Sequence, residues 1–175
     1  METAQSLLDR QEITELLYRY CRSVDRLDVD LGYSIWHSDG VADYGADVYQ
    51  GSGRGLIDFI CMQHRRALRH SHQISNILIA LEGDRAGSES YVTATLRVQN
   101  GHQQRQITVW SRYVDQWSRR DERWGLDRRV MIRDFDEIRD VDVISESDRG
   151  RRDRSDPSYA DVGDGHQQQE SSTCS

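Results

Sequence analysis

The histidines are the residues with the clearest chemical potential in this chain. There are six among 175 residues, and two of them, His70 and His72, stand in an H-x-H pattern. On a strand, both rings would project to one side, where they could ligate a metal ion. No third ligand stands at a telling spacing from them, so we predict no metal site. Removal of a proton from a substrate near neutral pH is the other chemistry to which an imidazole is suited.

The remaining reactive residue types exclude several mechanisms. Cys21, Cys61 and Cys174 are far apart and form no C-x-x-C pair, which argues against a disulfide framework or a zinc cluster. All 23 basic residues are arginines, so a Schiff-base lysine is excluded. Residues 51–55 read G-x-G-x-G, which fits a turn into a helix better than a dinucleotide-binding loop. We therefore expect no cofactor.

Composition limits the possible partners and compartment. The net charge is −7 and the isoelectric point is near 5.3, whereas a nucleic-acid-binding domain typically needs a basic face. The apolar stretches are far shorter than the roughly 20 residues of a membrane helix. The first ten residues carry no signal-peptide pattern. We expect a cytoplasmic protein that binds neither nucleic acid nor membrane.

The elements that must position these residues begin with helices. Apolar side chains recur at helical spacing from Ile13 to Leu27 and predict a first helix over about Ala4–Leu27. Second and third helices are predicted over about Val29–Trp36 and Arg54–His70. Glycine-rich residues 37–51, between these helices, resemble short strand pieces joined by a turn.

Alternating hydrophobicity then predicts four strands separated by turn residues. The predicted strands are Gln73–Leu81, Ser88–Val98, Gln106–Trp117 and Arg123–Phe135. Helices followed by strands indicate the α+β class, with three N-terminal helices packed on one face of a curved antiparallel sheet. A sheet that closes over the helices would form a cone-shaped α+β barrel with an internal pocket for a small molecule.

The composition changes after about residue 138. Residues 139–175 are dominated by Asp, Arg, Ser, Gly and Gln and contain the only proline, Pro157. Such a segment cannot bury enough apolar surface to offset its ordering entropy. We predict one domain over residues 1–138 and a polar, disordered tail over 139–175.

The order of these elements and several local motifs resemble the nuclear transport factor 2-like (NTF2-like) superfamily, in its SnoaL-like branch. The resemblance spans about Leu7–Ile138. It rests on five segments in order, namely LLYRYCRSVDRLD (16–28), YSIWHSDGVADYG (33–45), YQGSGRGLIDFI (49–60), HSHQISNILI (70–79) and RYVDQWSRRDERWGLDRRVM (112–131). The branch holds small cyclases, dehydratases and dehydrochlorinases, and the superfamily also holds non-catalytic proteins.

The resemblance implies a set of site residues. Relatives of hexachlorocyclohexane dehydrochlorinase and of bile-acid dehydratase have an Asp near the end of helix one and a His at the start of the strand after helix three, which match Asp25 and His72. The dehydratase Tyr matches Tyr20, and the dehydrochlorinase Arg matches Arg129. Asp28 competes with Asp25, and Arg128 and Arg133 compete with Arg129. Tyr20 could equally be a core residue.

The implied function is a cofactor-independent lyase or isomerase. In this reading His72 abstracts a proton from a hydrophobic cyclic molecule while Asp25 orients the imidazole, and Tyr20 or Arg129 assists the leaving group or an enolate oxygen. Two alternatives stay open. One is a non-catalytic ligand-binding or assembly domain, as in the β subunits of ring-hydroxylating dioxygenases, and the other is a ketosteroid-isomerase-like reaction with Asp43 or Asp134 as base. We also expect a homodimer or homotrimer, because an apolar sheet face is commonly exposed in this fold.

Overall fold

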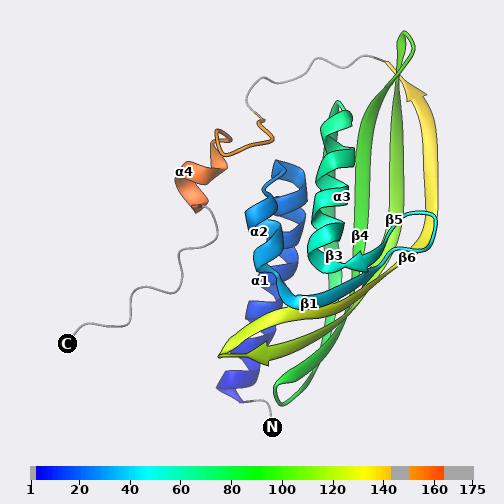
Figure 1. Ribbon diagram of the computed structural model, residues 1–175. Coiled ribbons are helices and arrows are strands. Elements are labelled where there is room, and N and C mark those ends of the chain that lie inside the picture. The colour runs from blue at the N-terminus through cyan, green and yellow to red at the C-terminus, as the bar shows by residue number, and fades with distance from the viewer. Residues whose placement is uncertain (1–2, 143–149, 164–175) are drawn as a thin grey trace.

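Helices and sheet form two layers in the computed structural model, which describes residues 3–142 and 150–163. The helices α1, α2 and α3 lie on the concave side of one strongly curved six-stranded sheet (Figure 1). The predicted α+β class, with N-terminal helices on a curved sheet, is confirmed. The sheet is mostly antiparallel.

The first helix, α1 (Ala4–Arg26), presents its apolar stripe to the sheet. Thr3 caps it by accepting a hydrogen bond from the Ser6 amide at 3.1 Å, and Leu27 ends it in the left-handed conformation with φ 55°. The buried positions Ile13, Leu17, Tyr20 and Val24 recur every three or four residues and are fully inaccessible. The helix is therefore held by burial of one face.

Two shorter helices follow. The side chain of Asp28 caps α2 (Val29–Ser34) through the Leu31 amide at 3.1 Å, and Ser52 caps α3 (Gly53–Arg66) through the Gly55 amide at 3.1 Å. The start of α3 packs directly on Trp36, since a Cβ at Gly53 would lie 2.0 Å from that indole ring. Glycine is required there by the close approach of helix and ring.

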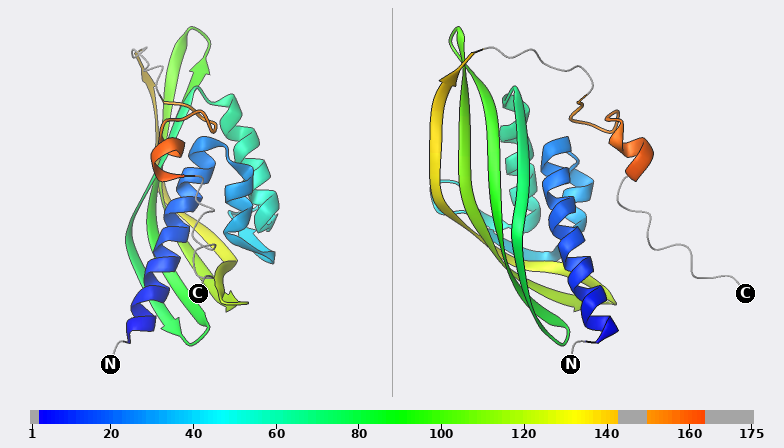
Figure 2. Two further views of the ribbon diagram at one scale, coloured as in Figure 1. Left: turned by 90° about the vertical axis from the view of Figure 1, so that its left-hand side faces the viewer. Right: turned by 180° about the vertical axis from the view of Figure 1, so that it is seen from behind.

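The strands follow the order β2-β1-β6-β5-β4-β3 across the sheet. Among the described strands, β1 and β6 alone pair in parallel, and the other neighbours are antiparallel. The bounds are β1 Trp36–Asp43, β2 Gln50–Ser52, β3 Arg69–Glu82, β4 Arg85–Asn100, β5 Gln103–Arg120 and β6 Arg123–Val141. Long β3 to β6 curve beneath the helices, as the view from behind in Figure 2 shows.

The core fills the space between the helices and the concave face of the sheet. Large buried side chains from the sheet include Trp117 and Trp124, 1% and 0% exposed. The Trp117 indole N–H donates to Ser88 Oγ at 2.9 Å, and that of Trp124 donates to Asp9 Oδ1 at 3.1 Å. Burial of these rings therefore leaves neither indole donor unsatisfied.

Several predicted boundaries differ from the structure. Helix two was expected to reach Trp36 but ends at Ser34, and helix three was expected to reach His70 but ends at Arg66. Ala67 turns the backbone into the extended region at ψ 147°, so His70 belongs to β3. No helix in the described part of the chain is long and apolar enough to cross a membrane.

The predicted boundary at residue 138 falls inside β6, which runs to Val141. Cross-strand pairs such as Arg105 Nε to Asp140 Oδ1, 3.0 Å apart, hold this polar end of the strand. Residues 150–163, also within the expected tail, contain the short helix α4 (Ser158–Val162) and contact α1 and α3. Residues 143–149 and 164–175, including Cys174, lie outside the described residues.

Candidate active site

Asp25 and His72 are in direct contact. Asp25 lies in the last turn of α1 and His72 near the start of β3, and Asp25 Oδ1 is 2.7 Å from His72 Nδ1. The other carboxylate oxygen accepts the backbone N–H of His72 at 3.0 Å. A carboxylate at a helix C-terminus is disfavoured by the helix dipole. These two hydrogen bonds compensate for that position and tie the end of α1 to β3.

The contact defines the tautomer of His72. A carboxylate can only accept, so Nδ1 carries the proton and Nε2 keeps its lone pair. No described residue bonds to Nε2, and the His72 side chain is 7% exposed and that of Asp25 14% exposed. An imidazole held in this way can take up a proton at Nε2 while the carboxylate stabilises the resulting cation.

The surroundings of His72 on the sheet are largely apolar. His72 pairs in register with Ala94 of β4, which pairs with Val109 of β5, so these three side chains share the inner face. The next row on that face holds Ile74, Val92 and Ser111. A molecule reaching Nε2 along this face would contact mainly hydrocarbon.

Tyr20 lies fully buried one helical turn and one residue before Asp25 and belongs to a polar cluster. Its hydroxyl is 2.8 Å from the hydroxyl of Tyr44, and its ring meets that of Tyr113 edge-on with centroids 5.6 Å apart. Burial raises the pKa of all three phenols well above the ordinary value, so each keeps its proton. The tyrosine hydroxyls are therefore available as hydrogen-bond donors.

Arg129 completes this cluster beneath the tyrosines. Its guanidinium lies 4.2 Å from the centroid of Tyr20 and 4.0 Å from that of Tyr113. Asp115 accepts two hydrogen bonds from it, Nε to Oδ1 at 2.8 Å and Nη2 to Oδ2 at 2.7 Å. Burial opposes the charge on Arg129, but Asp115 outweighs it and holds the pKa of Arg129 above its ordinary value. The third nitrogen, Nη1, has no partner among the described residues.

Cys21 links the two groups of residues electrostatically. Burial raises the pKa of its thiol to about 12, Arg129 lowers that pKa, and Asp25 raises it. Cys21 is thus close enough to both charges to sense them, and it is one helical turn before Asp25. On α1, Cys21 thus lies between Tyr20 of the tyrosine cluster and Asp25 of the Asp25–His72 pair.

The competing residues have other partners. Asp28 caps α2 and also accepts the Tyr159 hydroxyl at 2.8 Å. Arg128 is exposed, and Arg133 lies 3.5 Å from Asp47 at the surface with 48% of its side chain exposed. Of the three arginines considered, only Arg129 is buried in the interior.

The two carboxylates considered for an isomerase-like reaction are also committed elsewhere. Asp43 accepts the Gly45 amide at 3.0 Å and the Gln50 side-chain amide at 2.9 Å, and these bonds lower the pKa of Asp43. Asp134 is paired with Arg112 at 3.0 Å. Neither Asp43 nor Asp134 therefore presents an unpaired carboxylate to the protein interior.

His70 and His72 do project to one side of β3, but both rings already have partners. His70 Nε2 lies 3.0 Å from the Val24 carbonyl oxygen, to which it donates. Within residues 3–142 and 150–163, no three His, Cys, Asp or Glu side chains are arranged to hold a metal ion. The pair therefore acts as two separate hydrogen-bonding groups, one on the Val24 carbonyl in the last turn of α1 and one on Asp25.

Sequence reasoning missed three residues of this interior: Tyr44, His64 and Asp115. Asp115 offered a usable signal, because it lies at an inward position of β5 between Tyr113 and Trp117 in the alternating pattern. A charged residue at a core position requires a partner, and its cross-strand neighbour in register is Arg129. His64 carried no comparable signal.

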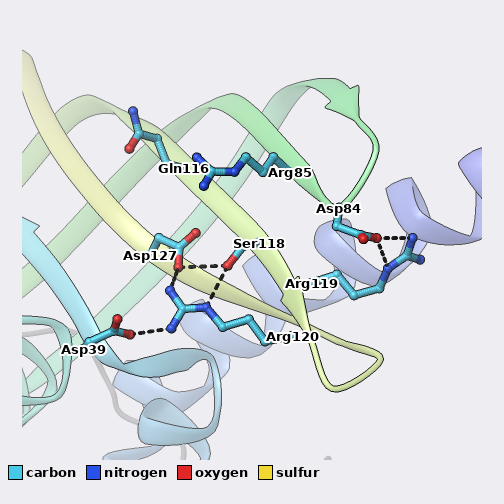
Figure 3. Close-up of a pocket in the computed structure, with 8 residues that line it drawn as sticks. All are labelled: Asp39, Asp84, Arg85, Gln116, Ser118, Arg119, Arg120 and Asp127. Atoms are coloured by element: carbon cyan, nitrogen blue, oxygen red, sulfur yellow. Dashed lines mark hydrogen bonds and ion pairs between the residues drawn. The ribbon is translucent and has the colours of Figure 1, made fainter.

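A pocket on the protein surface is lined by charged side chains, in contrast to the apolar surroundings of His72. Its volume is about 460 Å³, and it opens among charged side chains at one end of β5 and β6 (Figure 3). Arg119 is paired with Asp84 at 2.7 Å, and Arg120 with Asp39 at 2.8 Å and with Asp127 at 2.5 Å. Neither Asp25 nor His72 lines it, and its polar walls do not suit an apolar ring.

Solved structures with this fold include proteins of known and unknown activity. A hexachlorocyclohexane dehydrochlorinase LinA-type3 from Novosphingobium barchaimii aligns with TM-score 0.65 and 19% identity over 81% of this chain and 95% of that one. A protein named as a scytalone dehydratase from Novosphingobium aromaticivorans gives 0.66 and 18% over 81% and 97%. A protein named as an aromatic ring hydroxylase from the same species gives 0.66 and 25% over 77% and 94%.

The sequence itself identifies the family. A search of curated protein sequences gives no significant match. Residues 5–130, which include Asp25, His72 and Arg129, match the SnoaL-like domain. That span takes in α1 to β5 and the first half of β6. The chain therefore belongs to the SnoaL-like family and has its NTF2-like α+β fold.

Proposed function

We propose that this protein is a cofactor-independent lyase, of the dehydratase or dehydrohalogenase type, that acts on a hydrophobic cyclic small molecule. The observation that carries the proposal is the Asp25–His72 contact of 2.7 Å, with His72 Nε2 left unbonded beside apolar inward side chains. A pair with this geometry needs no metal ion to remove a proton from carbon.

The proposed reaction is an elimination. His72 Nε2 takes a proton from a ring carbon, and the electron pair of the broken C–H bond forms a C=C bond to the adjacent carbon. The leaving group departs from that carbon with the electron pair of the broken bond, either as halide or as hydroxide that takes a proton from solvent and becomes water. Asp25 stabilises the imidazolium, which then releases its proton to solvent.

In the proposed reaction, the tyrosine cluster and Arg129 stabilise the leaving group. Tyr20 and Tyr44 share one hydrogen bond between their hydroxyls, and Arg129 Nη1 is an unsatisfied donor of a charged group. A departing halide or hydroxide, or an enolate oxygen in an isomerase, would be stabilised by these donors in a site that excludes water. An isomerase would differ only in returning the proton to another carbon.

The substrate class is inferred from the interior and from the relatives. The inner sheet face beside His72 holds Ala94, Val109, Ile74 and Val92 and offers few polar partners. Two relatives of the same fold are named for a chlorinated cyclohexane and for scytalone dehydration. A compact apolar ring with one leaving group fits both observations.

The test is a panel of chlorinated cyclohexanes and cyclic β-hydroxy ketones incubated with the protein, with loss of HCl or water followed by mass spectrometry. Wild-type protein should convert at least one class, and His72→Ala should not. His102→Ala is the matched control, because His102 is exposed in the β4–β5 turn. Equal conversion by wild type and His72→Ala would overturn the assigned base.

A non-catalytic binding or assembly domain is the second candidate. The complete burial of the tyrosine cluster favours the non-catalytic candidate: Tyr20 and Arg129 are both 0% exposed. One relative of the same fold is named as an aromatic ring hydroxylase. Calorimetric binding of panel compounds at equal affinity by wild type and His72→Ala, with no turnover, would support this candidate.

We also propose that the protein forms a homodimer or homotrimer through the outer face of the sheet. Trp110 and Phe135 stack there with centroids 4.8 Å apart, although Phe135 is 60% exposed. Tyr91, Val114 and Ile132 add exposed apolar surface on the same face. Light scattering of wild type and Phe135→Glu should show a loss of the assembly in the variant, and a wild-type monomer would refute it.

A further inference from the structure

Residues 150–163 return to the helical layer on the side away from the sheet (Figure 2) and contact the C-terminal ends of α3 and of α1, where Asp25 also lies. Several contacts anchor the segment on α1 and on Asp28, the N-cap residue of α2. Asp156 lies 3.4 Å from Arg26, the Tyr159 hydroxyl donates to Asp28 at 2.8 Å, and Arg22 stacks over the Tyr159 ring at 4.6 Å. The segment therefore has a defined position relative to the candidate site.

A further contact reaches α3. Arg152 Nη1 donates to the carbonyl oxygen of His64 at 3.0 Å and to that of Ala67 at 2.8 Å. Carbonyl groups in the last turn of a helix lack part of their helical hydrogen bonding, and a cation there is favoured by the helix dipole. Arg152 thus fixes the backbone at the C-terminal end of α3.

His64 connects this backbone to the base. Its imidazole lies 5.1 Å from that of His72 and 4.3 Å from that of His70, centroid to centroid. His70 in turn donates to the carbonyl of Val24, the residue before Asp25. The three rings are packed at the junction of α1, α3 and β3, where both members of the pair are held.

We propose that Arg152 is a positioning residue of the active site: it fixes the end of α3, and through His64 it holds the ring of His72 in the orientation that faces Asp25. This inference rests on the proposed role of His72 as base. It assigns the C-terminal segment a part in the reaction, which Arg152 plays through its contacts with the end of α3.

The charges around His64 are consistent with this role. Burial lowers the pKa of His64 to about 3, with further lowering by His72 and His70 and a smaller effect of Arg152, while the Val24 carbonyl raises it. The groups that face the three-ring cluster are thus Val24 and Asp25 from α1, His70 and His72 from β3, and Arg152. His64 is neutral at physiological pH, so it packs against His72 without repelling the imidazolium formed in the reaction.

The first experiment follows the histidine ring signals of the full-length chain by NMR during a pH titration, and it needs no substrate. In Arg152→Met, the pKa of His64 should rise and the His72 signals should shift, because the end of α3 is released. Arg152→Lys should restore wild-type signals, since one ammonium can reach both carbonyls. Arg151→Met is the matched control, because Arg151 is exposed and is the adjacent residue of the same charge. Wild-type signals in Arg152→Met would overturn the proposal.

A double-variant comparison separates positioning from general loosening. If Arg152 acts through His64, Arg152→Met should move the His72 signals in the wild-type background but not in the His64→Ala background. His64→Ala alone should move them even if Arg152→Met fails to fold, and unchanged His72 signals in His64→Ala would contradict the proposal.

With a substrate from the compound panel, Arg152→Met should lose kcat by up to about 10²-fold, as expected for a misplaced catalytic group, with little change in KM. An unchanged kcat would refute the catalytic part. A wild type that converts no compound would refute the proposed function alone, and the NMR result would still decide whether Arg152 positions His72.

Discussion

Removal of Asp115 should be one of the most destabilising single changes in this protein. Asp115 and Arg129 each have 0% side-chain exposure and are joined by two hydrogen bonds of 2.8 and 2.7 Å. Asp115→Ala leaves a guanidinium buried between Tyr20 and Tyr113 without a counter-charge. Breaking a buried pair in this way costs about 3–5 kcal/mol in the free energy of unfolding.

The assay is urea unfolding followed by circular dichroism, together with a thermal melt. For a chain of this size about 1 kcal/mol corresponds to roughly 2–4 °C in Tm, so the expected fall is about 6–20 °C. Replacing both residues, as Asp115→Leu with Arg129→Met, should recover most of the loss because no unpaired charge remains.

Asp134→Ala is the matched control, because it breaks the exposed Arg112–Asp134 pair on the same two strands. Its effect on the free energy of unfolding should be much smaller than that of Asp115→Ala. A loss in Asp115→Ala no larger than in the control would refute the reasoning, because it would show that water reaches Arg129.

Three further changes should alter the free energy of unfolding or Tm. The lowered pKa of His64, about 3 in the folded state against roughly 6.5 unfolded, means that the unfolded chain binds the proton first as pH falls, so stability is lost between those values. Urea titrations at pH 7 and pH 5 measure how far the free energy of unfolding falls between the two pH values. The fall should be about 2 kcal/mol smaller in His64→Gln than in wild type. Tyr20→Phe leaves the Tyr44 hydroxyl buried without its partner and should cost about 1–3 kcal/mol in the same assay, whereas no loss would show that Tyr44 finds another partner. Ending the chain after Asp142 removes the contacts of Arg152 and Tyr159 and should lower Tm, and an unchanged Tm would show that they add nothing to stability.

Local pattern predicted most of the fold because burial dominates it. The stripe from Ile13 to Val24 and the alternation in β4 and β5 both correspond to buried faces. The far end of β6 could not be predicted in the same way. Residues 136–140 are exposed, and they are held by hydrogen bonds and charge pairs to β5 that are specified only once the strands meet.

The residues of the candidate site also differ in whether the sequence could predict them. Asp25, His72, Tyr20 and Arg129 came from a family resemblance, whereas their partners depend on contacts between distant segments. Asp115 was within reach of pattern reasoning, since it interrupts an inward row of β5. Arg152 was not, because it lies 88 residues from His64 in a polar segment whose composition is typical of a solvated tail.

The central claim, that His72 is a base oriented by Asp25, is tested most directly by the turnover of His72→Ala. With a substrate from the compound panel at saturating concentration, we predict that kcat falls by about 10²–10⁴-fold while the fold and ligand affinity persist. Added imidazole should restore part of the rate in proportion to its unprotonated fraction. A His72→Ala variant with wild-type kcat, unaffected by imidazole, would contradict the account.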